Sequence, residues 1–241
     1  MGQVRPKYYY EGDFSAYETL FRQYPHQELT FLKGQPLSVP GAYFYTHFFI
    51  LSGSIATFYL HCSGNEKQMF IHGPGIIWPL FIPKHFEQER NLRICALEET
   101  HCLAFDDETL QKIMEENSVL FSVMMNLARK TMDFLLFDCC NQCFNSGIER
   151  LCNCLYSLCR DLPDSSTDEE GCHIPITQTA LRGAVGLNKT NTHKHLSVLQ
   201  KNGILSAKRG EIVVHDFAGL CNFCSPEILH DDERPERRSV N

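Results

Sequence analysis

Two hydrophobic periods divide the chain. Between residues 28 and 105, short stretches rich in Phe, Tyr, Ile and Thr are separated by glycines about seven to twelve residues apart: Gly34, Gly41, Gly53, Gly64 and Gly75. Turn residues at this regular spacing between β-prone stretches are typical of a β-sandwich or β-barrel. The stretch NLRICALEETHCLAFD adds one or two further strands.

From about Asp107 to Asn145 the period becomes helical. An apolar seam with spacings of 4, 3, 4, 3 and 4 runs through this region: Phe121, Met125, Ala128, Met132, Leu135 and Cys139. Such a heptad-like seam packs either on the helix's own domain or against a second copy. We favour a dimer helix, because a long helix that joins two domains has little of its own chain to cover it.

The C-terminal part combines helices with a hairpin. A second helix, SGIERLCNCLYSLCRDL, follows a break at Asn145-Ser146-Gly147, and an acidic linker occupies residues 161–171. A helix, a turn, a helix and a hairpin then extend from Ile176 to His215, before a polar tail that begins at Ser225. The pattern predicts an α+β protein with four parts: an effector-sensing β-barrel or jelly roll (1–116), a dimerisation helix (117–145), a winged helix-turn-helix domain (146–225) and a flexible tail (226–241).

The helix-turn-helix has its own start and stop signals. Thr177 can cap the helix TQTALRGAV, Gly186 can end it in a left-handed conformation, and Asn188 can cap the helix KTNTHKHLSVLQKN. Leu196 and Leu199 then face inward. Polar and basic residues gather at the exposed start of the second helix, which in this motif enters the major groove: Lys189, Thr190, Asn191, His193 and Lys194.

Local charge supports DNA binding despite a formal net charge of -7. Between Ile176 and Gly210 there are six basic residues and no acid, and Arg209-Gly210 forms the turn of a hairpin suited to phosphate contact. Phosphates respond to charge within a Debye length of about 8–10 Å. A solvated basic helix on an ordinary domain is the alternative, but turn glycine, acid-free span and basic hairpin together favour DNA.

Order and motifs together resemble the CRP/FNR family of bacterial transcription regulators over nearly the whole chain. The stretch ITQTALRGAVGLNKTNTHKHLSVLQKNGIL resembles the family's DNA-binding signature, and FFILSGSIATFYL resembles its barrel. The resemblance implies a homodimer on a palindromic site in double-stranded DNA, acting with RNA polymerase. Lys189 and Lys194 stand where arginines are usual, Thr190 stands where many members have Glu, and Arg182 replaces a small residue.

The barrel's signal is expected to be a small aromatic or phenolic acid. Arg90 falls where cyclic-nucleotide-binding members hold the phosphate, but Leu80 occupies the position of their ribose-binding Glu. The stretches GPGIIWPLFIPKHFE and CALEETHCLAF resemble instead the branch of the family that regulates organohalide respiration. That resemblance implies an effector site with Trp78, Phe81, Arg90 and Lys130, in which Lys130 pairs with a phenolate.

Twelve cysteines offer a rival sensor. Candidate ligands for zinc or an iron–sulfur cluster flank the hinge or form a CxxC near the C-terminus: Cys139, Cys140, Cys143, Cys221 and Cys224. A thiol switch and plain packing of small side chains are further possibilities.

Enzyme and membrane roles are disfavoured. No nucleophile elbow, P-loop or dinucleotide fingerprint occurs, and the barrel histidines are scattered. No apolar run approaches the ~20 residues that span a bilayer, and the N-terminus lacks the apolar middle of a secretory signal. We therefore expect a cytoplasmic protein that is not an enzyme.

Overall fold

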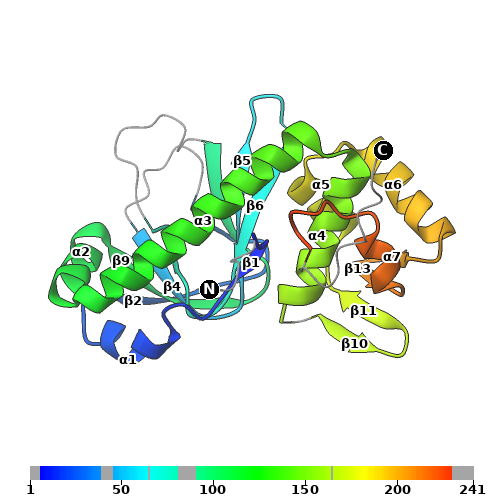
Figure 1. Cartoon of the computed structure of the whole chain (residues 1–241). Helices are drawn as coiled ribbons and strands as arrows, with labels where there is room; N and C mark the ends of the chain where they lie inside the picture. The colour runs from blue at the N-terminus through cyan, green and yellow to red at the C-terminus, as the bar shows by residue number, and fades with distance from the viewer. Residues whose placement is uncertain (1–5, 39–45, 65, 81–90, 164, 230–241) are drawn as a thin grey trace. The chain divides into compact units, whose positions relative to one another are not determined.

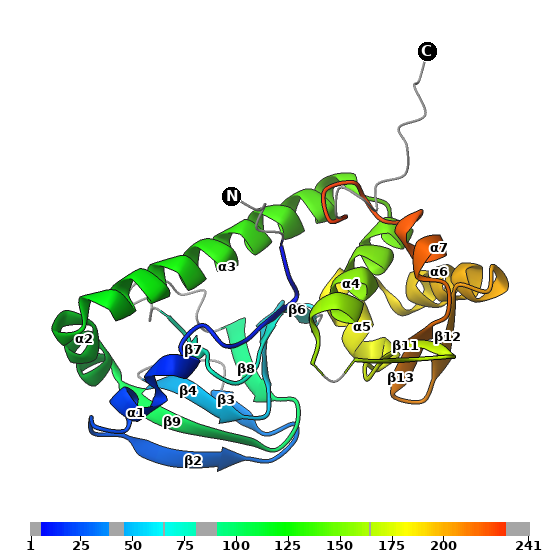
Figure 2. The same cartoon turned by 60° about the horizontal axis from the view of Figure 1, so that its bottom comes forward.

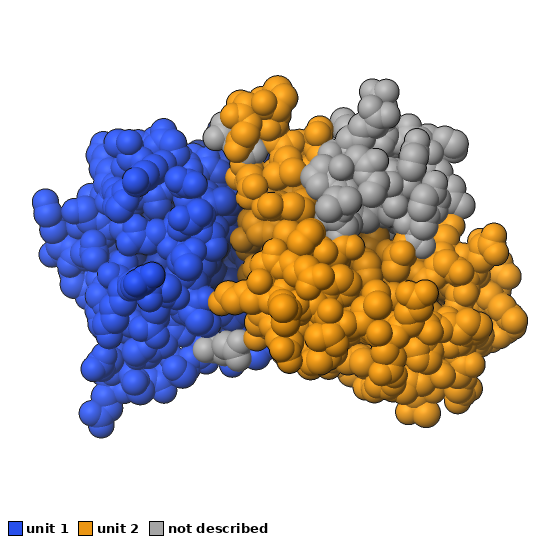
Figure 3. All heavy atoms as spheres, turned by 180° about the vertical axis from the view of Figure 1, so that it is seen from behind, with its two compact units in different colours: residues 1–8, 133–241 blue, residues 9–132 orange. Residues whose placement is uncertain are grey.

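The chain consists of two compact units. The computed structural model describes residues 6–38, 46–64, 66–80, 91–163 and 165–229. One unit comprises residues 9–132, and the other comprises residues 1–8 and 133–241 (Figure 3). The chain therefore passes from one unit to the other twice, after Tyr8 and inside the long helix. The division falls within that helix, between Met132 and Asp133.

Residues 9–132 form the predicted barrel of two sheets, and Figure 2 shows β2 beside β9 in one of them. The five-stranded sheet has the order β1-β6-β5-β8-β3, and the four-stranded sheet has the order β2-β9-β4-β7. All pairings are antiparallel except β1 with β6. The strands are β1 (Tyr9–Tyr10), β2 (Gln27–Phe31), β3 (Pro36–Ser38), β4 (Thr46–Ser52), β5 (Ile55–Leu60), β6 (Glu66–His72), β7 (Ile77–Trp78), β8 (Leu92–Ala96) and β9 (Thr100–Asp106).

The predicted turn glycines hold the barrel's corners. Gly34, Gly53, Gly64 and Gly75 all have φ between +75° and +81°, a region that other residues rarely adopt. At Gly53, between β4 and β5, a Cβ atom would lie 2.3 Å from the carbonyl oxygen of Glu99, so the close approach of the two loops also requires glycine. Gly41 lies outside the described residues.

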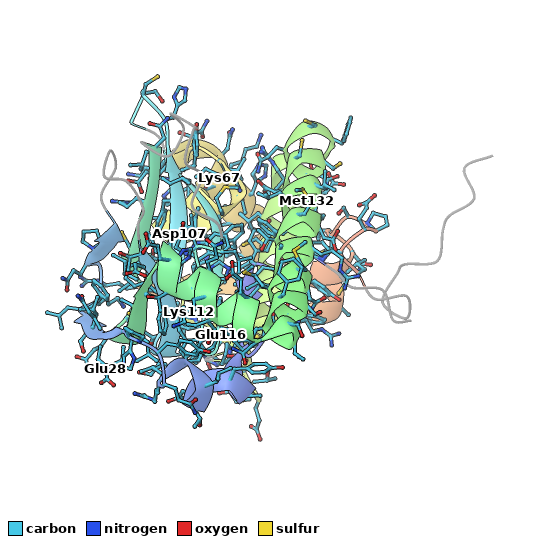
Figure 4. All side chains as sticks on the ribbon, turned by 90° about the vertical axis from the view of Figure 1, so that its left-hand side faces the viewer. Glu28, Lys67, Asp107, Lys112, Glu116 and Met132 are labelled. Atoms are coloured by element: carbon cyan, nitrogen blue, oxygen red, sulfur yellow. The ribbon has the colours of Figure 1, made fainter. Side chains whose placement is uncertain are left out.

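The helical region comprises two helices, and the second spans nearly the residues (117–145) that were expected to form the long helix. A 3-10 turn (Ser15–Tyr17) and α1 (Glu18–Phe21) lie between β1 and β2 in the chain, whereas α2 (Asp107–Glu116) and α3 (Ser118–Phe144) follow the last strand of the barrel, β9 (Figure 1). Asn117 ends α2, where its side-chain amide donates to the carbonyl oxygen of Ile113 at 2.9 Å and to the hydroxyl of Tyr24 at 3.2 Å. Asn favours such local bonds over helix continuation. Figure 4 labels Asp107, Lys112 and Glu116 on α2 and Met132 on α3.

The other unit holds the predicted helix-turn-helix and hairpin. Its elements are α4 (Gly147–Asp161), β10 (Ser166–Asp168), β11 (Gly171–Ile174), α5 (Gln178–Val185), α6 (Lys189–Lys201), β12 (Leu205–Lys208), β13 (Glu211–Val214) and α7 (Phe217–Cys221). The strands form one sheet, β10-β11-β13-β12. The acidic stretch 161–171 is therefore more than a linker, because its strand β10 pairs with β11. Ser146 and Glu149 close a capping box at the start of α4, which confirms the predicted break.

A buried polar network fixes the ends of this unit. Asn141 of α3 accepts hydrogen bonds from Asn153 at 3.0 Å and from Asn145 at 2.8 Å, and the backbone amide of Ser225 donates to Asn153 at 2.9 Å. Packing continues beyond Ser225, where the sequence predicted a flexible tail, because the side chains of residues 228 and 229 are fully buried. Within the described ranges, no helix is long and apolar enough to cross a membrane.

Candidate DNA-binding surface and effector site

Helices α5 and α6 are joined by the short turn that the sequence predicted. Thr177 caps α5 by accepting from the amide of Ala180 at 3.1 Å, and Asn188 caps α6 by accepting from the amide of Asn191 at 2.8 Å. Between them Gly186 ends α5 with φ +63°, a left-handed cap. These local signals set the ends of both helices, and both helices also pack on α4.

The predicted reading residues all lie at the exposed start of α6. Five of them are solvent-exposed on α6: Lys189, Thr190, Asn191, His193 and Lys194. Arg209, in the turn between β12 and β13, is also exposed. On the opposite side of α6, Thr192, Leu196 and Leu199 are buried, as predicted. The helix therefore presents donors and cations outward while its apolar face packs on the domain.

A small hollow lies at this surface, and it includes residues that the sequence interpretation did not select. It has a volume of about 170 Å³ and is lined from α5 by Gln178, Thr179 and Arg182, and from α6 by Lys189, Thr192 and His193. Gln178 and Thr179 follow the cap of α5 directly, so the cap position itself was the signal that could have found them. Polar side chains from both helices thus face the same solvent.

Solved structures with the same architecture are bacterial regulators. CprK complexed with OCPA has a TM-score of 0.66 and 17% identity over 90% of this chain and 98% of that chain. CLP of Xanthomonas campestris, a c-di-GMP-responsive regulator, has a TM-score of 0.69 and 18% identity over 79% and 94% of the two chains. A mutant of CooA from Carboxydothermus hydrogenoformans has a TM-score of 0.69 and 19% identity over 86% and 90%.

Sequence decides what the fold alone leaves open. Residues 149–223 match the Crp-like helix-turn-helix domain. The chain therefore carries a Crp-like helix-turn-helix domain at residues 149–223, and its fold is shared with the solved structures above. A search of curated protein sequences found no match for this chain.

Helix α3 carries two apolar stripes. One stripe, which includes Leu120, Leu127 and Phe134, is fully buried against the rest of the chain. The predicted seam lies on another side, where Phe121, Met125, Met132 and Cys139 are exposed while Ala128 and Leu135 are half-buried. Met132 is 56% exposed, and Leu136 beside the seam is 60% exposed. One face of the helix therefore packs within the chain, and a second apolar face stays exposed to solvent.

Inside the barrel, Trp78 lies in an aromatic nest. It ends β7, and its ring centroid is 4.3 Å from that of His72 and 4.9 Å from that of Phe70, both on β6. Because β6 and β7 belong to different sheets, these rings lie between the sheets. The predicted residues Phe81 and Arg90 lie outside the described residues.

Lys130 lies on α3 and is already paired within the chain. Its ammonium nitrogen is 2.5 Å from Asp13 Oδ1, and its backbone carbonyl oxygen accepts a hydrogen bond from the hydroxyl of Tyr10 at 3.2 Å. The Tyr10 ring lies 6.0 Å from the ring of His72. Tyr10 and His72 therefore connect Trp78 to Lys130. Only the alternation of Gln68, Phe70 and His72 along β6 could have pointed to His72 from the sequence.

The candidate cysteine ligands fall into two groups. Cys139, Cys140 and Cys143 are exposed on α3, whereas Cys221 and Cys224 are buried at and after α7. The thiol of Cys224 donates to the carbonyl oxygen of Leu220 at 3.5 Å. Among the described residues, no group of three or more His, Cys, Asp or Glu side chains could hold a metal ion.

Proposed function

We propose that the chain is a DNA-binding transcription regulator of the CRP family that acts as a homodimer on a palindromic promoter site, in contact with RNA polymerase. The observation that carries this proposal is that one chain has both a basic, exposed start of helix α6 and an exposed apolar face on helix α3. An apolar stripe at heptad spacing finds its partner in a second copy of the same helix. Two-fold symmetry then presents two reading helices to half-sites about one helical turn apart.

We further infer that a small aromatic or phenolic acid binds in the barrel and biases the dimer toward DNA. The aromatic rings around Trp78, which meet it edge-on (Phe70) or tilted (His72), support this ligand class, since aromatic side chains favour a flat apolar body. The effector must bind the DNA-competent arrangement more tightly than the idle one, because equal affinity shifts no equilibrium.

Two experiments test this proposal. Analytical ultracentrifugation of the purified chain should give a dimer, and a monomer at micromolar concentration would contradict the role of α3. Selection of bound sequences from a random DNA pool should return an inverted repeat, and addition of chlorinated phenols or aryl acids should tighten binding to it. A selected site without two-fold symmetry would remove the palindromic part of the proposal.

A thiol switch is a second candidate, because two thiols touch in the DNA-binding unit. The Cys172 thiol on β11 lies 4.0 Å from the carbonyl oxygen of Cys159 at the end of α4. A hydrogen bond from the Cys159 thiol lowers the pKa of Cys172, which favours the reactive thiolate. Peptide mapping after mild peroxide treatment should then find a Cys159–Cys172 disulfide, and unchanged thiols with unchanged DNA affinity would dismiss this candidate.

A further inference from the structure

His72 is a buried polar side chain without a hydrogen-bond partner among the described residues. It ends β6 and is 0% exposed, and neither Nδ1 nor Nε2 makes a hydrogen bond there. Aromatic rings surround it, with centroids 4.3 Å away for Trp78, 5.0 Å for Phe70 and 6.0 Å for Tyr10. On burial, this imidazole loses its hydrogen bonds to water, and no described residue replaces them.

Unpaired buried nitrogens destabilise a fold, and phenylalanine would fill the same space without that penalty. Positions that break a local rule in this way are commonly functional sites. Among the described residues nothing satisfies the ring of His72, so a bound ligand with a polar group is a candidate partner for it. A buried histidine elsewhere in the same barrel makes the contrast: His47 is 1% exposed, but its Nδ1 is 2.6 Å from the carbonyl oxygen of Pro79 and its Nε2 is 3.4 Å from Asp107 Oδ1.

The surroundings of His72 favour a neutral partner. Burial lowers the pKa of His72 to about 3, with no contribution from a charged side chain, so the ring is unprotonated near neutral pH. Tyr10 on β1 is the titratable group among the rings packed against it. The cation that lies beyond Tyr10, Lys130, is neutralised by Asp13 at 2.5 Å. Among the rings packed against His72 and the described charges beside them, an ionised ligand would find no free counter-charge.

We propose that His72 binds the hydroxyl group of an aromatic effector in its un-ionised form, so that the hydroxyl donates to the bare ring nitrogen. This inference rests on the proposed effector function of the barrel, and it replaces the expected pairing of Lys130 with a phenolate. Neutral imidazole offers one acceptor and one donor, which suits a neutral hydroxyl. A phenolate could use only the donor.

Thr57 offers a second polar contact on the same inner face. Ile55 pairs with His72 across the β5–β6 ladder, and Thr57 stands two residues further along β5. Successive residues of a strand alternate between faces, so Thr57 shares the face of Ile55. The Thr57 Oγ1 atom is also buried without a hydrogen-bond partner among the described residues. A ligand with a second polar group on its ring would satisfy both side chains.

Binding of 2,4-dichlorophenol as a function of pH tests the proposal on the full-length dimer. Its chlorines move the ionisation of the hydroxyl toward neutral pH, so calorimetric titrations from about pH 6 to about pH 9 cover both forms. The dissociation constant should stay level at low pH and then rise about tenfold per pH unit once the ligand ionises. Tighter binding of the phenolate would overturn the inference while leaving an aromatic effector in place. No binding at any pH would overturn both.

A matched ligand and three variants separate binding from packing. 2,4-Dichloroanisole lacks the hydroxyl proton and should bind at least about tenfold more weakly; equal affinity would overturn the role of His72. His72→Phe should abolish phenol binding yet raise the melting temperature by a few degrees, because it removes two unpaired nitrogens. His72→Gln should keep measurable binding. His47→Phe, the control, should lower the melting temperature, and a similar drop for His72→Phe would assign His72 a structural role instead.

Discussion

The exposed start of α6 and the interior of the barrel both present polar groups that have no partner among the described residues, but in different surroundings. Lys189 and Lys194 extend into water, where an unpaired charge is well solvated. His72 and Thr57 are buried, where an unpaired donor or acceptor destabilises the fold. The comparison teaches that an exposed site can be recognised from residue types and spacing, whereas a buried one emerges only when the folded chain fails to satisfy its own atoms.

The largest expected effect is on the exposed side of this comparison. Lys189→Ala together with Lys194→Ala should weaken promoter binding by about 100-fold or more, since each lysine contact to DNA contributes about 1–3 kcal/mol. Fluorescence anisotropy with the selected inverted repeat measures the loss, and the salt dependence should also become shallower. Lys201→Ala, at the exposed far end of the same helix, is the control and should change affinity little. Equal losses for both variants would indicate bulk charge rather than a reading helix.

A charge on the exposed apolar face of α3 should prevent dimerisation. Met132→Glu would bury an unpaired carboxylate in each copy at the dimer seam, which destabilises such interfaces by about 3–5 kcal/mol. Sedimentation equilibrium should then give monomers at concentrations where the unmodified chain is dimeric. Ser122→Glu introduces the same charge at an exposed position outside the seam and should leave the dimer intact. A dimer that survives Met132→Glu would mean that the seam is covered in some other way.

The share of structural features that the sequence predicted differs between the two regions, and the reason is physical. Both caps, the left-handed glycine and the hairpin turn of the DNA-binding unit depend on residues within four positions of each other, and all were predicted. The barrel strands were also anticipated from their turn glycines. The prediction missed a feature set by a distant partner: the stretch 161–171 was expected to be a linker, but β10 forms within it because β11 is beside it. Likewise, nothing in the spacing of β6 reveals that His72 lacks a partner.

A smaller effect separates the two interpretations of Lys130. If its main task is to neutralise Asp13, then Lys130→Ala and Asp13→Asn should each lower stability by about 1–2 kcal/mol, because each leaves a partly buried group unpaired. The double variant should be more stable than the sum of the two losses predicts. Thermal unfolding measures this coupling, and titration of the double variant with 2,4-dichlorophenol measures binding. Full retention of binding would leave His72 as the polar contact, whereas its loss would return Lys130 to the effector site.

The smallest expected effect compares His72 with a partnered histidine of the DNA-binding unit. His173 Nδ1 is 3.1 Å from Glu211 and its Nε2 is 3.2 Å from Asp168; the bond to Glu211 and then that to Asp168 raise the pKa of His173. A raised pKa stabilises the fold below the unfolded value of about 6.5, and this stabilisation is lost as pH rises through the folded value. The lowered pKa of His72 has the opposite sign, so its stabilisation is present above about pH 6.5 and is lost as pH falls toward 3. Melting temperatures between about pH 5 and about pH 8.5 should therefore decline less on the alkaline side in His173→Gln and less on the acid side in His72→Phe. If the melting temperature of His72→Phe declines at acid pH as much as that of the unmodified chain, then His72 already has a hydrogen-bond partner. The barrel interior would then not be a buried site with unpaired polar groups.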